Sequence, residues 1–506
     1  YCGFTTLTLP NSLQTIKDPE FSDNAGAFHG NYRLTKVVIP GNVTRIGGNA
    51  FRGCTSLSQV TFSKGVTTIG ASAFQGCSSL RSITLPEGLT TIEGAAFYGC
   101  DLVNVSLPSS LKTIEDCAYQ GRPSSAYGTF GGNKNLASII IPNGVTKIGS
   151  FAFQYCTSLQ TIVLSNELLT LGESAFLYCS SLRSINIPKE ASTIQASTFW
   201  GCSALSEVTL SEGLTSIEAN AFYNCSSLKT IQLPKSITSL TSAFEYSGLE
   251  EIEIPEGVAV LKYTFRHCEK LSKVILPSSL TTIDSHSFYE CKSLVSITIP
   301  QSVQVIGNSA FQGCSNLNKI NLPQSITTIE SNAFAYCTSL REMTIPSKVT
   351  KIDNDIFQGC TSLISVTLSN NITSIGLRSF ADCHSLTNIN MPTELTYIDG
   401  TAFQNCTSLR SITIPSKVTQ LSGAIFNGCS SLASITLLPA TPPTINNTFH
   451  GVPSTAVIKV PCRNMDAYLT DSIWNATVTL PIQELPANIV TVASNSNRMG
   501  EAVVLI

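Results

Sequence analysis

The sequence predicts a solenoid, α/β in class but mostly β, whose short coils stack into a curved, right-handed array. Each coil is expected to add one strand to a parallel concave sheet of about 21 short strands and one short helical turn to the convex side. Phenylalanine recurs nineteen times from Phe28 to Phe449, mostly every 23 residues and with cysteine three residues later. Proline directly follows sixteen of 21 apolar segments in this register. Repeats this short must stack because they cannot bury their own apolar residues.

The repeat at residues 317–337 indicates what one coil contains. Segment 320–322 alternates apolar and polar residues as a half-buried strand does, and Pro323 ends it because proline has no N–H for the ladder. Residues 326–329 should bring the chain back across the core in an extended conformation. Residues 333–337 are compact enough for a helical turn on the opposite side. The expected coil is therefore strand, extended return and short helix.

Composition excludes two classes of protein. Charged residues make up 12% of the chain and the net charge is −3, so no nucleic-acid partner is implied. Mean hydropathy is +0.19, yet no apolar run approaches the roughly 20 residues of a membrane span. A surface of Ser, Thr, Asn and Gln suits a secreted protein. Because the chain opens at Tyr1 in mid-repeat, we expect a processed monomer whose export signal and anchor are not part of this chain.

The repeat also resembles a known family. The pattern L-x-x-I-x-I-P-x-x-V-T-x-I-G-x-x-A-F-x-x-C-x-S-L occurs with small variations at Leu136–Leu159 and Leu294–Leu317. It resembles the BspA-like (treponemal-class) leucine-rich repeats of bacterial cell-surface proteins over about residues 1–455. The resemblance implies a leucine-rich repeat solenoid that lies outside the cell and binds host matrix proteins or other cells.

Three regions are expected along the chain. Residues 1–455 form the repeats, residues 456–486 a C-terminal capping unit, and residues 487–506 the start of a further β-domain. Within the capping unit, an amphipathic helix is predicted over 463–474 and a last strand over 478–480. The apolar side of that helix is expected to consist of Met465, Tyr468, Leu469 and Ile473.

The cysteines are expected to be buried free thiols. Fifteen of the 18 occupy one register position, where a small buried side chain is wanted. Stacked parallel side chains seldom have disulfide geometry, and no paired C-x-x-C completes a zinc site. Cys2, Cys117 and Cys462 lie outside the register, and Cys117 is expected to be exposed.

No catalytic constellation is evident. The five histidines are scattered over different repeat positions, and no nucleophile, base and orienting group converge. Asp353 and Asp355 lack the further ligands that calcium needs. We therefore expect a non-enzymatic protein without metal or cofactor.

The surface is expected to be mostly uniform, because Thr and Ser occupy the outward positions of nearly every predicted strand. Departures from this background are the candidate binding residues. Ile140 and Val163 should form an apolar spot beside an insertion, and Glu251 and Glu253 an acidic spot where the repeat interval shortens.

Two insertions interrupt the register, at Lys17–Gly26 and within Asp116–Asn133, and are expected to loop out. The second carries Tyr119, Arg122 and Tyr127. These residues are candidates for ligand binding because aromatic and arginine side chains are common interface anchors.

An aromatic stripe provides a different candidate site. Trp200, Tyr178 and Tyr223 follow the repeated phenylalanine by one or two residues, as do Tyr98, Tyr155, Tyr289 and Tyr336. Such rings either pack between coils or stack on sugars. The sequence thus favours a recognition or adhesion protein that binds host or cell-surface proteins. The alternatives are a glycan-binding protein and a structural spacer that presents another domain.

Overall fold

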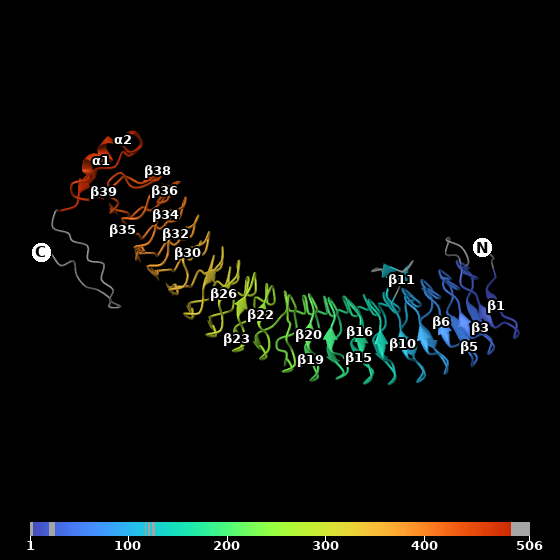
Figure 1. The fold of residues 1–506 in the computed structure, drawn as a ribbon. Coiled ribbons are helices and arrows are strands. Elements are labelled where there is room, and N and C mark those ends of the chain that lie inside the picture. Colours follow the sequence, from blue (N-terminus) through green and yellow to red (C-terminus); the bar gives the residue numbers. More distant parts are fainter. Residues whose placement is uncertain (1–3, 20–25, 117, 120–121, 124–126, 487–506) are drawn as a thin grey trace. The chain divides into compact units, whose positions relative to one another are not determined.

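The computed structural model describes residues 4–19, 26–116, 118–119, 122–123 and 127–486. It comprises two compact units, Tyr1–Leu280 and Thr281–Ile506, called unit 1 and unit 2 below. In each unit the chain winds through successive coils, and strands of neighbouring coils pair in parallel (Figure 1). The predicted parallel solenoid is therefore confirmed, whereas the concave position of its sheet stays a prediction.

One strand from most coils forms the first ladder, in which the middle residue faces the core. In β25 (Ser296–Thr298), for example, Ile297 is buried between two exposed neighbours. In unit 1 this ladder contains β1 (Thr6–Thr8), β3 (Lys36–Ile39), β5 (Gln59–Phe62), β7 (Ser82–Thr84), β9 (Asn104–Ser106), β13 (Ser138–Ile140), β15 (Thr161–Val163), β17 (Ser184–Asn186), β19 (Glu207–Thr209), β21 (Glu251–Glu253) and β23 (Lys273–Ile275). In unit 2 it contains β25, β27 (Lys319–Asn321), β29 (Glu342–Thr344), β31 (Ser365–Thr367), β33 (Asn388–Ile389), β35 (Ser411–Ile414), β37 (Ser434–Leu437), β39 (Val457–Val460) and β40 (Ile482–Glu484).

Two of the 21 predicted strands are wrong. Residues 231–233 form no strand, in the region where the repeat interval shortens. Residues 478–480 follow a helix without forming a strand, and the last strand is β40, after Pro481. The sequence signal at 478–480 was a proline after an apolar residue, which does not by itself require a strand.

The predicted extended return is a second parallel ladder of two- or three-residue strands. In unit 1 it contains β2 (Thr15–Ile16), β4 (Arg45–Ile46), β6 (Thr68–Ile69), β8 (Thr91–Ile92), β10 (Thr113–Ile114), β14 (Lys147–Ile148), β16 (Thr170–Leu171), β18 (Thr193–Ile194), β20 (Ser216–Ile217) and β22 (Val260–Leu261). In unit 2 it contains β24 (Thr282–Ile283), β26 (Val305–Ile306), β28 (Thr328–Ile329), β30 (Lys351–Ile352), β32 (Ser374–Ile375), β34 (Tyr397–Ile398), β36 (Gln420–Ser422) and β38 (Thr444–Asn446). Strands this short cannot show alternation in the sequence, so their pairing was missed.

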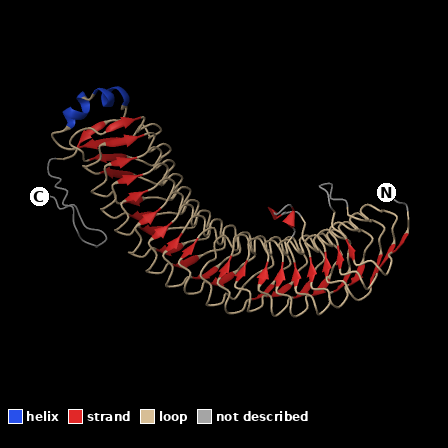
Figure 2. Ribbon diagram, turned by 45° about the vertical axis from the view of Figure 1, so that its right-hand side comes forward, coloured by secondary structure: helices blue, strands red, loops and turns tan. Residues whose placement is uncertain are grey.

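The prediction of a short helix around each phenylalanine is wrong. These segments are hydrogen-bonded turns. Around Phe311, for example, Ser309 and Gly313 have φ angles of 54° and 74°. Left-handed residues cannot continue a right-handed helix. The N–H of Phe311 donates to the carbonyl of Ala333 in the next coil at 2.8 Å. Figure 2 shows helices only at the C-terminal end of the described chain.

The phenylalanine rings form a stacked column in the core of each unit, with neighbouring ring centroids 5.2–5.9 Å apart. The register cysteines lie beside this column, buried and free as predicted. In most coils the cysteine thiol donates a hydrogen bond to the carbonyl of the phenylalanine 26 residues before it, as Cys314 does to Phe288 at 3.1 Å. Cys462 is partly exposed, and Cys2 and Cys117 lie outside the described residues.

The predicted C-terminal helix is two short helices, α1 (Met465–Thr470) and α2 (Ser472–Thr477). The chain breaks at Asp471, which has a ψ angle of 125° and whose carboxylate accepts two N–H groups of α2. This break turns Leu469 and Ile473 outward, 44% and 50% exposed, against the prediction.

Two large side chains attach the helices to the stack. The Tyr468 hydroxyl donates to the carbonyl of Pro439 at 2.7 Å, and the Trp474 indole N–H donates to that of Pro443 at 2.8 Å. This packing supports a capping role, although the boundaries at 455 and 486 stay predictions. Residues 487–506 lie outside the described residues. No helix among the described residues could span a membrane.

Candidate binding surfaces

The outward face of the first ladder in unit 1 carries a pair of adjacent apolar residues in its hydroxyl background, besides the single exposed side chains of Val38 and Ile275. Ile140 and Val163 are direct register partners in β13 and β15, and their exposed fractions are 68% and 57%. The equivalent residues of the flanking coils are Ser106 and Asn186. Two adjacent apolar side chains left in solvent contribute nothing to the core, so this spot is a candidate contact for a partner.

The apolar spot is not beside the insertion, contrary to expectation. The insertion leaves the stack after β10 of the second ladder, whereas Ile140 and Val163 belong to the first ladder. Figure 1 accordingly places β11 and β15 at opposite edges of unit 1. The insertion and the apolar spot are close in the sequence, which suggested that they are also close in space, but they belong to different ladders of the coil.

The predicted acidic spot is partly neutralised. Glu251 accepts a hydrogen bond from Lys273 in the next coil at 3.2 Å. Glu253 has Ile275 as its register partner, and that side chain is 47% exposed. Because residues 231–233 form no strand, a small hollow of about 150 Å³ opens beside β21. Acidic, basic and apolar groups therefore meet here, rather than a patch of one charge.

Both insertions start after a second-ladder strand and begin with the same anchor. The Asp116 carboxylate accepts an N–H of the next coil at 2.5 Å and lies 2.6 Å from the ammonium of Lys147. Asp18 likewise accepts an N–H of the next coil at 2.5 Å and binds the Arg45 guanidinium at 3.0 and 3.1 Å. These aspartates fix the base from which each insertion leaves the coil.

Within the second insertion, β11 (Ala118–Tyr119) and β12 (Arg122–Pro123) form an antiparallel pair in which Tyr119 opposes Arg122. Tyr127 returns to the stack, is 41% exposed and packs edge-on against Tyr98 with centroids 4.7 Å apart. Desolvation and the nearby Tyr127 hydroxyl raise the pKa of Tyr98. The insertion thus joins an aromatic surface of unit 1.

That surface continues as an aromatic edge, which we define by its side chains. The edge consists of Tyr155, Tyr178, Trp200, Tyr223, Tyr246 and His267. Neighbouring ring centroids are 4.3–5.4 Å apart in the contacting pairs. Four members were predicted, and the two that were missed, Tyr246 and His267, share the register position of Tyr178 and could have been found from it.

The backbone of the aromatic edge is unusual. Tyr155, Tyr178 and Tyr246 have φ angles of 57°, 57° and 58°, in the left-handed region that costs a bulky residue about 1–2 kcal/mol. The Tyr178 ring compensates by covering Gly201 of the next coil, where an added Cβ would stand 2.5 Å from the ring. Its faces are therefore used mainly in packing between coils, while the residue stays 39% exposed.

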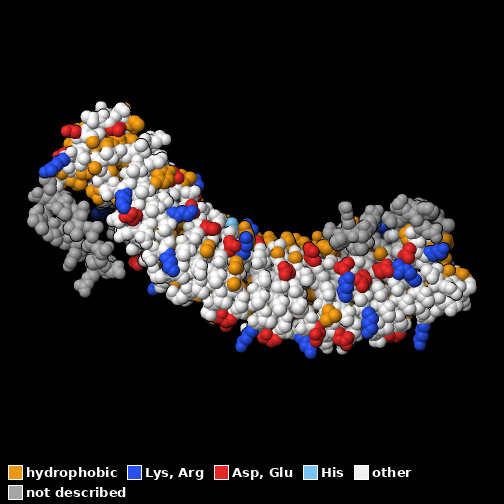
Figure 3. All heavy atoms as spheres, viewed as in Figure 1, with side chains coloured by type: hydrophobic (Ala, Val, Ile, Leu, Met, Phe, Trp, Pro, Cys, Tyr) orange, Lys and Arg blue, Asp and Glu red, His pale blue; other side chains and the backbone are white. Residues whose placement is uncertain are grey.

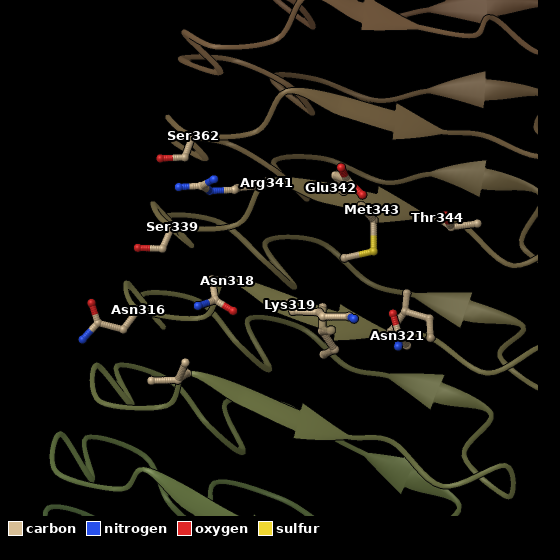
Figure 4. Close-up of a pocket in the computed structure, with 13 residues that line it drawn as sticks. Asn316, Asn318, Lys319, Asn321, Ser339, Arg341, Glu342, Met343, Thr344 and Ser362 are labelled. Atoms are coloured by element: carbon tan, nitrogen blue, oxygen red, sulfur yellow. The ribbon is translucent and has the colours of Figure 1, made fainter. Parts of the chain in front are cut away.

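Unit 2 contains a larger hollow that sequence reasoning missed. It measures about 810 Å³ and lies between the coils of β27 and β29, over the buried Met343. Figure 4 shows its polar side chains in two groups. Asn316, Asn318, Ser339, Arg341 and Ser362 gather at the turn end, and Lys319, Asn321, Glu342 and Thr344 follow the strands. No sequence pattern marks the interruption in strand pairing that accompanies this hollow.

Several charged groups elsewhere pair with one another. Asp353 lies 2.9 Å from Lys351, and Asp355 binds Arg378 at 2.7 Å. The described residues contain no group of three or more His, Cys, Asp or Glu side chains placed to hold a metal. Figure 3 shows acidic and basic side chains interspersed on the face in view.

Comparison with family models finds the BspA type leucine rich repeat region (6 copies) at residues 1–126, 124–243, 240–364 and 352–468. No curated protein matches the chain. Solved structures include a leucine-rich repeat protein of Bacteroides ovatus, with 21% identity, TM-score 0.35, and coverage of 95% of this chain and 94% of that one. A leucine rich cell surface protein of Faecalibacterium prausnitzii has 26% identity, TM-score 0.30, and coverage of 77% and 88%.

Proposed function

Because the chain belongs to the BspA-type leucine-rich repeat family, we propose that it is a non-enzymatic recognition or adhesion protein of a bacterial cell surface that binds host or partner proteins. Its fold offers long exposed faces instead of one deep enclosed site, which suits many weak contacts with a protein. The described residues bring together no nucleophile, general base and metal site of the kind that would favour catalysis.

The observation that carries the proposal is the exposed pair Ile140 and Val163 on an otherwise hydroxyl-rich ladder. Threonine would satisfy the strand at both positions and would be better solvated. The apolar choice therefore gains nothing for folding, but a partner that covers both side chains would gain about 1.5 kcal/mol or more from each. This pair is proposed as the centre of the protein-binding face.

The test replaces both residues by threonine, Ile140→Thr with Val163→Thr. Binding of the purified chain to host cells and to a panel of extracellular-matrix proteins is measured by surface plasmon resonance and cell adhesion. We expect at least about tenfold weaker binding with an unchanged melting temperature. The matched control is Thr84→Ala with Ser106→Ala on the same face, which should bind as the parent does. Equal binding by both variants would remove this face from the proposal.

Glycan binding is a second candidate, supported by the aromatic edge. Left-handed tyrosines at three coils are costly where glycine would fit, and all three stay partly exposed, which favours a use in binding. A glycan array probed with the parent and with Tyr155→Gly plus Tyr178→Gly separates the two functions, because glycine suits that backbone. Signals lost only in this variant would favour a glycan ligand. An array without signals, together with no cell or matrix binding, would leave the spacer role.

A further inference from the structure

The large hollow of unit 2 coincides with an interruption of both ladders. No pairing joins β27 to β29 or β28 to β30 in the described part of unit 2. In the next pair of coils, by contrast, the N–H of Ile364 donates to the carbonyl of Arg341 at 2.8 Å. The corresponding bond from Arg341 to Asn318 is absent among the described residues. The Arg341 N–H and the Asn318 carbonyl, on the two sides of the hollow, therefore make no main-chain bond to each other.

The Ser347 N–H and hydroxyl each donate to the Gln324 side-chain oxygen at 3.4 Å, and the main-chain bonds found between these two coils in the described residues lie in the turn at the phenylalanine column. There the N–H of Phe334 donates to Ile356 at 3.0 Å, and the Phe334 and Phe357 rings stack with centroids 5.9 Å apart. The coils therefore stay joined on the column side while their strands separate. The resulting space of about 810 Å³ is within the roughly 300–1,000 Å³ of known ligand sites.

The side chains around the hollow are also without partners. Arg341, Asn316 and Asn318 make no side-chain hydrogen bond or ion pair among the described residues, and neither do Lys319 and Glu342. Some arginines elsewhere do pair, as Arg378 does with Asp355. At the turn end of the hollow, the Arg341 guanidinium lies with two amides and two serine hydroxyls, and no acidic side chain lines that end. This group of donors suits a carboxylate ligand.

We propose that this hollow binds an extended peptide segment of a partner protein by one of its acidic side chains. The carboxylate binds Arg341 with the amides of Asn316 and Asn318 beside it, and the peptide main chain bonds to the Arg341 N–H and the Asn318 carbonyl. Lys319 and Glu342 flank the peptide along the strands, where their opposite charges favour a neutral neighbouring residue. The site rests on the proposed protein-binding function and assigns it a ligand chemistry.

The experiment probes the full chain with an array of blocked octapeptides of randomised sequence. Peptides captured by the parent should be enriched in Asp and Glu. Arg341→Gln should lose that enrichment and bind acidic peptides about tenfold or more weakly, since hydrogen bonds to charged groups are involved. Arg341→Lys should retain only part of the binding because it lacks the planar fork.

The matched control is Arg410→Gln, which removes the equivalent cation beside β35, at a residue that does not line the hollow. It should capture the same acidic peptides as the parent, and all three variants should keep the parental melting temperature. No acidic enrichment in the parent, or equal enrichment with Arg341→Gln, would overturn the proposal. Persistent cell or matrix binding in that case would leave the proposed function standing, because its test residues lie in unit 1.

Discussion

At the residue scale, the phenylalanine column and its cysteines are what the register predicted. Phe311 is fully buried between Phe288 and Phe334, with ring centroids 5.2 and 5.5 Å away. Each ring thus contacts two other coils, and its removal cannot be repaired within one repeat. The thiol of Cys337 closes the same arrangement by donating to the Phe311 carbonyl at 3.2 Å.

Replacing Phe311 by alanine should therefore destabilise unit 2 by about 3–5 kcal/mol, because a cavity opens between coils that remain hydrogen bonded. Denaturant unfolding measures the loss, and amide hydrogen exchange should show it strongest in the two adjacent coils. Thr344→Ala on the exposed ladder is the control and should change stability by less than about 0.5 kcal/mol. A loss below about 1 kcal/mol for Phe311→Ala would contradict the stacked column.

The buried thiols predict that the folded protein loses stability at alkaline pH. Burial raises the pKa of Cys156 and Cys360 to about 12, chiefly through desolvation of the thiolate. Unfolded thiols ionise near pH 8.5, so the native state binds more protons above that pH and its stability falls as pH rises toward 12. The expected slope is about 1.4 kcal/mol per pH unit for each thiol released on unfolding.

Urea unfolding at pH 8 to 11 measures this slope, and a thiol reagent at pH 8 provides an independent readout. Native protein should label slowly, whereas denatured protein should expose nearly all thiols. Rapid labelling of many thiols before unfolding would be inconsistent with the buried cysteine column.

At the element scale, the alternating strands were predictable, but the turns and the second ladder were not. The strand signal at Ile320 is local, because period-two alternation and the following proline are both visible in the sequence. Left-handed Ser309 carries no such signal, since serine usually occupies other conformations. The break at Asp471 was missed because a capping aspartate also fits inside an amphipathic pattern.

The anchor of the second insertion should loosen in acid. Burial of Asp116 favours its neutral form by desolvation, but Lys147 and the N–H of Ser150 outweigh it and lower the pKa. A lowered pKa means that the stabilisation is present above the unfolded pKa of about 3.9 and is lost as pH falls through the native value.

Asp116→Asn should accordingly cost about 0.5–1 kcal/mol at neutral pH, a small value because the carboxylate is 37% exposed. Hydrogen exchange at the Ser150 amide should speed up in the variant, and in the parent only at pH below about 4. Asp353→Asn, where the ion pair is on the coil itself, serves as the control. An unchanged Ser150 amide in Asp116→Asn would argue against the anchor.

At the scale of the whole molecule, the sequence predicted the solenoid and its candidate residues but not how they group. Register alone placed Ile140 next to Val163, because each coil has one residue at that position. It could not place them relative to Tyr127, since that requires knowing which ladder the insertion leaves. The hollow at Arg341 depends on strand separation that no residue pattern encodes.

The second insertion should contribute to partner binding without supporting the fold. Triple replacement of Tyr119, Arg122 and Tyr127 by alanine should weaken cell or matrix binding severalfold and lower the melting temperature by no more than a few degrees. Adhesion assays and thermal unfolding measure the two effects. Glu251→Lys with Glu253→Lys tests the mixed-charge spot in parallel. If binding survives both sets of changes, the insertion and this spot are not part of the binding surface.

The direction of the hydrogen bonds between coils has a consequence for association. Ladder N–H groups donate to both neighbouring coils, backward as Thr67 does to Thr44 at 2.8 Å and forward as Ile141 does to Val163 at 2.9 Å, and turn N–H groups donate forward, as Phe51 does to Ala73 at 2.7 Å. The front of any coil is therefore complementary to the back of any other, including a coil of another molecule. A surface of this kind permits head-to-tail polymerisation into open filaments. Because Tyr468 and Trp474 pack α1 and α2 on the segment that links β37 and β38, we expect these helices to hinder such stacking at that end of unit 2.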